Sequence, residues 1–176
     1  MRLEDAGPEL KLSRRKRASV VLKSFFDRIP LERNRVSVVA VYNGAKVVVE
    51  DSRDFEVVRN ILDDLPMEYA FIKGQTTLFA GLEEAVRIAR PWNPRSTTFV
   101  LVSDGDTVPG TGMPKLPISV KGVLVVGVGD PHTGKFLSGR HSRQDVATLR
   151  QIAARLGGVY HNGNQRHLST ETLDLL

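Results

Sequence analysis

The feature that most constrains the fold is the alternation of two hydrophobic periods along the chain. Segments with apolar residues three or four positions apart alternate with short runs of consecutive apolar, β-branched residues. The first spacing is typical of amphipathic helices, and the second is typical of strands buried on both faces. This alternation predicts an α/β fold in three layers, in which helices cover both faces of a doubly wound, mostly parallel sheet. A chain of 176 residues suits one such domain.

The expected elements follow from these periods and from turn signals. Asn43-Gly44 signals a hairpin, so the sheet should end in one antiparallel edge strand. Residues 1–11 have no periodicity and read as a loop or tail, which leaves residues 12–176 as the domain. Strands are predicted at Val36–Tyr42, Ala45–Glu50, Thr98–Ser103, Gly122–Val128 and from Val159. Helices are predicted at Ser13–Ile29, at Phe55–Leu65, at Leu78–Ala89 and from Ser169. Another helix is predicted to end at Leu156, with Ser142 as its N-cap and Asp145 completing a capping box.

Composition and charge exclude several classes of protein. The chain has no cysteine, which excludes disulfides, thiol catalysis and cysteine-ligated zinc. No apolar run approaches the roughly 20 residues of a transmembrane helix. The net charge of +5 is densest at Lys11 and Arg14–Arg17, where a helix begins. No nucleic-acid-binding motif accompanies this cluster, so nucleic acid is not expected as a partner. A solvated first turn is the favoured interpretation, with a phosphate, membrane-surface or protein contact as the alternative.

Polar groups gather where two predicted segments end or begin. Asp104 and Asp106 follow the strand Thr98–Ser103, and Thr76 and Thr77 open the helix that begins at Leu78. Ligands of open α/β sheets bind at the carboxyl ends of the strands. Hydroxyl and carboxylate oxygens there suit hard cations such as Mg²⁺ or Mn²⁺. The alternative is purely structural, with a threonine as N-cap and Asp104 as a turn residue.

Four segments, taken in order and with their spacing, resemble the von Willebrand factor A-type (vWA) family. The likeness extends over residues 12–168 and is greatest to the bacterial branch that occurs beside MoxR-type AAA+ ATPases and includes the Bat aerotolerance proteins. The segments are Gly74-Gln-Thr-Thr-Leu-Phe-Ala-Gly-Leu-Glu-Glu-Ala85, Val100-Leu-Val-Ser-Asp-Gly105, Val125-Val-Gly-Val-Gly-Asp-Pro131 and Leu149-Arg-Gln-Ile-Ala-Ala-Arg-Leu-Gly-Gly-Val-Tyr160.

The resemblance implies a non-enzymatic protein–protein interaction module that works with a MoxR-type ATPase in assembly or chaperone-like tasks. Family members carry a metal-ion-dependent adhesion site, in which Thr76 and Asp104 would be metal ligands for Mg²⁺, Mn²⁺ or Ca²⁺. An acidic residue of the protein partner would complete the coordination. The binding surface would then include the loop 105–117 and the neighbouring residues Gln75, Thr77, Gly105 and Asp106.

The sequence departs from the family pattern at its start. No Asp-x-Ser-x-Ser loop precedes the first predicted helix, and Asp5 has neither serine beside it. In this branch a methionine commonly follows that motif, so Met1 aligns with it. The alignment implies that the first, central strand is missing between Val36–Tyr42 and Thr98–Ser103, and that metal binding is weak or absent. One alternative remains open for the function, namely a degenerate scaffold that binds no metal. Two remain open for the location: the cytoplasm, or the periplasm-facing part of a membrane-anchored parent.

Two enzyme motifs are weaker alternatives. Asp104 and Asp106 fit the nucleophile motif of haloacid-dehalogenase-like, Mg²⁺-dependent phosphatases, but no paired-acid motif follows. Gly129 to Lys135 matches a phosphate-binding loop up to its lysine, yet Phe136 stands where a Ser or Thr should follow. The four histidines share no metal-ligand spacing and are predicted to lie on the surface.

Overall fold

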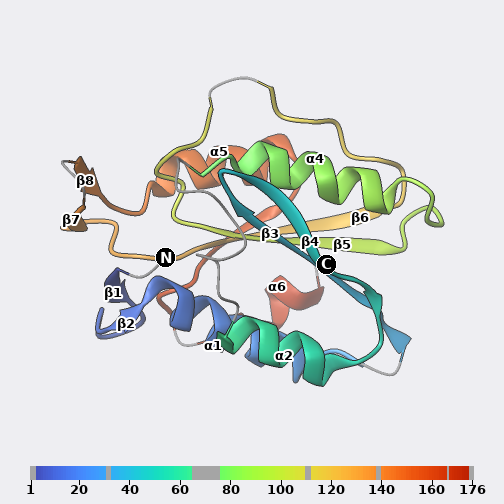
Figure 1. The fold of residues 1–176 in the computed structure, drawn as a ribbon, viewed down its shortest axis with the longest axis horizontal. Helices are drawn as coiled ribbons and strands as arrows, with labels where there is room; N and C mark the ends of the chain where they lie inside the picture. Colours follow the sequence, from blue (N-terminus) through green and yellow to red (C-terminus); the bar gives the residue numbers. More distant parts are fainter. Residues whose placement is uncertain are drawn as a thin grey trace.

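A computed structural model gives the fold of residues 3–30, 33–64, 76–109, 112–137, 140–165 and 167–174, the part of the chain described below (Figure 1). The helices are α1 (Arg14–Phe26), α2 (Phe55–Asp64), α4 (Leu78–Ala89), α5 (Val146–Arg155) and α6 (Thr170–Asp174). The strands are β1 (Glu4–Ala6), β2 (Leu12–Ser13), β3 (Val36–Tyr42), β4 (Gly44–Ser52), β5 (Thr97–Ser103), β6 (Val120–Gly127), β7 (Lys135–Leu137), β8 (Arg140–Ser142) and β9 (Val159–Asn162).

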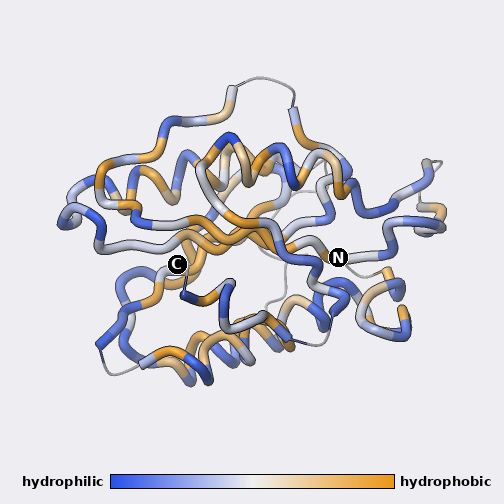
Figure 2. The backbone as a smooth tube through the Cα atoms, turned by 180° about the vertical axis from the view of Figure 1, so that it is seen from behind, coloured by the Kyte–Doolittle hydropathy of each residue, from blue (hydrophilic) through white to orange (hydrophobic). Residues whose placement is uncertain are grey.

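The centre of the molecule is a parallel sheet in the order β5-β6-β9, accompanied by the antiparallel ribbon β3-β4. Helices α4 and α5 lie on one side of these strands, and α1 and α2 lie on the other (Figure 1). The most hydrophobic segments run through the strands between the two helix layers (Figure 2). This is the predicted three-layer α/β arrangement, including the antiparallel strand, and the prediction of fold class is confirmed.

The central strand β6 supplies both hydrophobic cores through its alternating side chains. Leu124 and Val126 are buried against α1 and α2, whereas Val123 and Val125 are buried against α4 and α5. Successive residues of a strand point to opposite faces, so an unbroken apolar run fills both layers. Trp92, which follows α4, packs on the second core.

The strands do not form one continuous sheet in the described part of the chain. There, β3 pairs only with β4, and β5 pairs only with β6. The short strand β1 pairs with β2, so the N-terminal residues do not bridge the two sheets. The missing central strand and the alignment of Met1 stay predictions.

Two local predictions of secondary structure were wrong, and one hairpin was missed. Within residues 1–11, expected to be a loop or tail, the structure forms β1, in which Asp5 and Ala6 are buried. Ser142 does not cap α5, because it ends β8. Asp145 is the N-cap instead, and its carboxylate accepts a hydrogen bond from the backbone N–H of Thr148 at 3.0 Å. The β7–β8 hairpin was not predicted at all.

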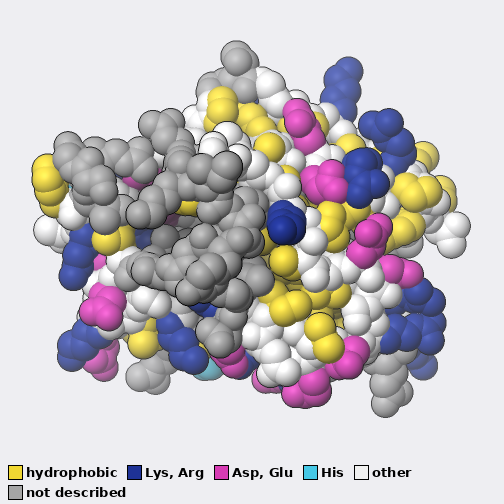
Figure 3. Space-filling model, in the orientation of Figure 1, with side chains coloured by type: hydrophobic (Ala, Val, Ile, Leu, Met, Phe, Trp, Pro, Cys, Tyr) yellow, Lys and Arg dark blue, Asp and Glu magenta, His cyan; other side chains and the backbone are white. Residues whose placement is uncertain are grey.

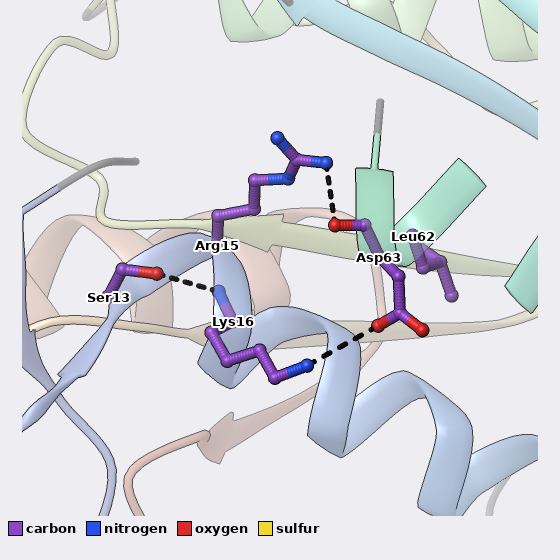
Figure 4. Close-up of a pocket in the computed structure, with 5 residues that line it drawn as sticks. All are labelled: Ser13, Arg15, Lys16, Leu62 and Asp63. Carbon is purple, nitrogen blue, oxygen red and sulfur yellow. Dashed lines mark hydrogen bonds and ion pairs between the residues drawn. The ribbon is translucent and has the colours of Figure 1, made fainter. Parts of the chain in front are cut away.

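The basic cluster at the start of α1 divides into an inner and an outer pair. Arg14 and Arg17 are buried, which corrects the interpretation of a solvated first turn. Arg15 and Lys16 instead line a shallow pocket with Asp63 of α2 (Figure 4). Arg15 donates to the Asp63 carbonyl at 2.8 Å, and the Lys16 Nζ lies 3.6 Å from its carboxylate. These contacts join α1 to α2 and account for much of the cluster without nucleic acid.

The surface otherwise mixes charges of both signs. On the face shown in Figure 3, acidic and basic side chains of the described residues lie among one another. No helix in the described ranges is long and apolar enough to cross a membrane.

Asp63 generates a prediction for acid stability. Hydrogen bonds from Lys23 and Ser19, aided by nearby lysine charges, lower the pKa of Asp63 to about 2. This stabilisation is present above the unfolded-state pKa of about 3.9 and is lost as the pH falls towards 2. Asp63→Asn should therefore lower the melting temperature slightly at pH 7, and the difference from wild type should shrink towards pH 2. Glu83→Gln, at an exposed position of α4, is the matched control. A constant difference at every pH would contradict the assignment.

Candidate functional site

The carboxyl ends of β3, β5, β6 and β9 meet at one end of the molecule, and the loops that follow them form what we call the carboxyl-end face. Its loops are held together by backbone hydrogen bonds. The N–H of Val128 donates to the carbonyl of Ser103 at 3.0 Å, and the N–H of Gly163 donates to Gly127 at 2.8 Å. Ligands bind at this end of open α/β sheets, so it is the candidate functional site.

A fully buried arginine lies at the centre of this face. Arg14 is 0% exposed, and its guanidinium joins Asp5, Asp104 and Ser142, a set that we call the arginine cluster. Its Nε and Nη2 donate to the two carboxylate oxygens of Asp5 at 2.8 and 2.6 Å. Its Nη1 donates to Asp104 Oδ2 at 2.7 Å and to Ser142 Oγ at 2.9 Å, and Nη2 also reaches the Ser142 carbonyl at 3.1 Å.

The electrostatics of the arginine cluster hold Arg14 in its charged form. Burial alone lowers the pKa of Arg14, but hydrogen bonds and charges of Asp5 and Asp104 together outweigh burial and raise it. Removing one partner of a buried ion pair typically costs about 3–5 kcal/mol, because an uncompensated charge remains. The arginine cluster therefore stabilises the fold, and Asp104 is the one of its four residues that is partly exposed.

Local structure places Arg14 in this position. Ser13 is the N-cap of α1 and accepts a hydrogen bond from the N–H of Lys16 at 3.1 Å. The N–H of Arg14 donates to the carbonyl of Leu3 at 2.9 Å. The first turn of α1 is thereby tied to the N-terminal segment, and the Arg14 side chain is directed towards the end of β5.

Asp104 lies on a tight turn after β5. Its Oδ1 accepts the N–H of Asp106 at 3.2 Å, and its backbone carbonyl accepts the N–H of Asp145 at 2.7 Å. Gly105 has φ +74°, and a Cβ there would lie 2.8 Å from Leu149 Cγ, so a side chain would be both strained and obstructed. Both carboxylate oxygens of Asp104 are thus engaged by the protein itself.

The two loops predicted to share a site are adjacent. Thr107, after Asp104, donates its hydroxyl to the carbonyl of Thr76 at 3.2 Å. Thr77 is exposed at the N-cap of α4, but its hydroxyl donates to the carbonyl of Tyr42 at 3.2 Å instead of capping the helix. Gln75 lies outside the described residues. A cation or water shared by Thr76 and Asp104 stays a prediction.

The residues around Asp104 do not fit a divalent cation. Mg²⁺ and Ca²⁺ require oxygen ligands at about 2.0–2.6 Å, whereas the cation nearest Asp104 Oδ2 is the Arg14 guanidinium, at 2.7 Å. A second cation on the same carboxylate would be repelled by a buried positive charge. Within the described ranges, no three Asp, Glu or His side chains converge in a way that could hold a metal ion.

The loop after β6 is also organised by a carboxylate. Asp130 accepts the N–H groups of His132, Thr133 and Gly134 at 2.8, 3.2 and 3.3 Å. These bonds lower its pKa, overcoming the burial that by itself raises it. The N–H groups that a phosphate-binding loop would offer to phosphate are therefore occupied, and Lys135 begins β7 and not a helix.

Sequence reasoning missed the arginine cluster and a second buried group beside it. Arg17, one turn after Arg14, donates hydrogen bonds to the carbonyls of Gly163 and Gln165. Asn164 accepts the N–H of Gly7 at 3.0 Å and donates to the carbonyl of Gly129 at 2.7 Å. The missed signal is that the two arginines, three positions apart, continue the apolar stripe of α1.

Comparisons with known proteins support the fold. No protein-family model and no curated protein matches the chain. The structure of an aerotolerance-related membrane protein from Bacteroides fragilis is similar, with a TM-score of 0.70, 17% identity, and coverage of 98% of this chain and 90% of that one. BatB, a conserved hypothetical protein from Bacteroides thetaiotaomicron, is similar with a TM-score of 0.70, 15% identity, and coverage of 99% and 87%. At these identities the likeness shows a shared Rossmann-like α/β fold.

His161, in β9, generates a prediction for pH dependence. It is buried, against the prediction of surface histidines, and burial followed by the charge of Arg17 lowers its pKa. Below the unfolded-state pKa of about 6.5, the unfolded chain therefore binds a proton at this histidine that the folded chain does not. The free energy of unfolding consequently decreases as the pH is lowered. His161→Gln should reduce the decline in melting temperature between pH 7.5 and pH 5.5, two buffers chosen to bracket that value. The exposed His167→Gln is the control, and an unchanged pH profile in His161→Gln would refute the assignment.

Proposed function

We propose that this chain is a vWA-type interaction module that binds another protein through its carboxyl-end face and catalyses no reaction. The observation that carries the proposal is the state of Asp104, whose two oxygens are engaged by Arg14 and by the N–H of Asp106. A carboxylate held in this way shapes and charge-balances a surface. The likeness in fold to the Bat-type structures supports the vWA assignment.

The partner that we propose is a MoxR-type AAA+ ATPase, and the task is assembly or chaperone-like work. Loops from strands far apart in the sequence contribute to the face, and Thr107 ties two of them together through Thr76. Thr77 is exposed beside them. A surface whose loops are held together by hydrogen bonds is suited to recognising a folded partner with little loss of conformational entropy.

A phosphatase is the less supported alternative. A nucleophilic aspartate needs an oxygen free to attack phosphorus and a metal beside it. Here Asp104 Oδ2 is 2.7 Å from the Arg14 guanidinium, and both groups belong to the largely buried arginine cluster. This arrangement favours a structural role for Asp104.

The first test is partner binding. Thr76→Ala should weaken binding of the purified chain to a MoxR-type ATPase of the source organism by about fivefold or more, because truncating a hot-spot residue near the centre of an interface costs more than about 1 kcal/mol. Ser96→Ala removes an exposed hydroxyl at the opposite end of the sheet and should leave the dissociation constant unchanged. Isothermal titration calorimetry measures both. Equal effects of the two substitutions would place the interface elsewhere, and no binding by wild type would exclude this partner.

The second test is hydrolysis. Wild type and Asp104→Asn should both show only background hydrolysis of p-nitrophenyl phosphate with excess Mg²⁺, because the Asp104 carboxylate is already engaged. Release of p-nitrophenol is followed by absorbance. Turnover by wild type that disappears in Asp104→Asn would establish the phosphatase and end the interpretation as an interaction module.

A further inference from the structure

The arginine cluster provides a hydrogen-bond acceptor for every N–H donor of the Arg14 guanidinium. An arginine side chain has five N–H donors, one on Nε and two on each Nη. In this structure Nε reaches one oxygen, and Nη1 and Nη2 reach two each, all from Asp5, Asp104 and Ser142. Two carboxylates, a hydroxyl and a carbonyl thus converge on a single planar cation. This is the kind of oxygen-rich surrounding that a hard metal ion would otherwise occupy.

The backbone around the arginine cluster is shaped to the guanidinium. Gly129, after β6, has φ +106°, and a Cβ added there would lie 2.6 Å from Arg14 Nε and 3.1 Å from its Cζ. Gly129 therefore forms a wall in direct contact with the guanidinium. Its carbonyl is fixed by the side-chain amide of Asn164 at 2.7 Å. The space at the end of β5 and β6 is filled by Arg14 and closed by backbone.

The charges of the buried side chains also indicate that Arg14 occupies the place of a cation. Arg14 and Asp5 are both almost completely buried, and Asp104 is partly buried. Two carboxylates without a cation would repel one another at this depth, so the arginine cluster needs a positive charge. The Arg14 guanidinium supplies it covalently, from the first turn of α1.

We propose that Arg14 is the built-in cation of the carboxyl-end face, so that the face needs no divalent metal, and that the oxygens of Asp5, Asp104 and Ser142 would bind one if Arg14 were removed. The inference rests on the proposed function only in taking this face as the binding surface. It assigns Arg14 and Asp5 to the site, and both lie outside the pair Thr76 and Asp104 that the sequence suggested.

Manganese binding to the full chain tests the proposal without any partner. Electron paramagnetic resonance titration with Mn²⁺ should show no site in wild type tighter than millimolar. Arg14→Ala should create one site that is at least tenfold tighter, and the second change Asp5→Asn should remove it. Arg17→Ala is the matched control, because it removes a buried arginine of the same helix that binds the carbonyls of Gly163 and Gln165.

Each outcome decides the question. A site in wild type that is lost in Asp104→Asn would overturn the proposal, as would a folded Arg14→Ala chain that gains no Mn²⁺ binding. Circular dichroism checks folding, and Arg14→Gln, which keeps much of the side-chain volume without the charge, replaces Arg14→Ala if that variant does not fold. Partner binding that is equal in excess EDTA and in excess Mg²⁺ would support the statement that the carboxyl-end face needs no divalent metal, and binding that is lost in EDTA would contradict it. Absence of any partner binding would bear on the proposed function alone.

Discussion

The buried guanidinium of Arg14 is the interaction on which the rest of this structure depends. It joins four segments: β1, the start of α1, the turn after β5 and the end of β8, the last two of which lie 90 and 128 residues along the chain from Arg14. A buried charge is tolerated only when its partners are in place, so the segments must assemble together or leave charges unpaired. The arginine cluster therefore acts as a coupling point between local structure and the tertiary fold.

This coupling explains why so short an N-terminal segment is ordered. Strand β1 has three residues and pairs only with the two residues of β2 in the described part of the chain. Such a ribbon is too small to be stable alone. Asp5 contributes the ion pair with Arg14, and Gly7 donates its N–H to the buried Asn164. Polar contacts with Arg14 and Asn164 thus stabilise a ribbon that is too small to form a hydrophobic core of its own.

Hydrophobic periodicity was sufficient to predict the longer helices and strands, because each of them packs a stripe or run of apolar residues into the two cores, but it missed the short strands β1, β7 and β8. The order of the motifs suggested that Thr76 and Asp104 lie on adjacent loops, and Thr107, in the loop of Asp104, donates its hydroxyl to the carbonyl of Thr76. A site shared by the side chains of Thr76 and Asp104 stays a prediction. Periodicity failed for Arg14 because a run of basic residues resembles a solvated helix turn. Which arginine faces inward depends on its phase relative to the apolar stripe. Arg14 and Arg17 are in phase with Ala18, Val21 and Phe25, whereas Arg15 and Lys16 are not.

Ser142 shows the other limit of local patterns. A serine followed three residues later by an acid matches a capping box, but the same serine also suits the end of a short strand. In the structure Ser142 ends β8, where Arg14 donates hydrogen bonds to both the hydroxyl and the carbonyl of Ser142. Asp145 was then left to cap α5. Interactions between distant residues thus decided between two locally acceptable structures, and a single sequence gives no direct signal for them.

A cation that belongs to the chain has different physical properties from a bound metal. Metal affinity varies with pH and with metal concentration, because the ligands must be deprotonated and the ion must be supplied. An arginine keeps its charge at any physiological pH. Burial lowers the pKa of Arg14, but the interactions with Asp5 and Asp104 outweigh burial, so that the pKa is raised. The planar fork also fixes the direction of each acceptor, which a spherical ion does not. On the proposed assignment, the carboxyl-end face presents a constant charge and shape to its partner, and the energy of binding comes from the surrounding loops.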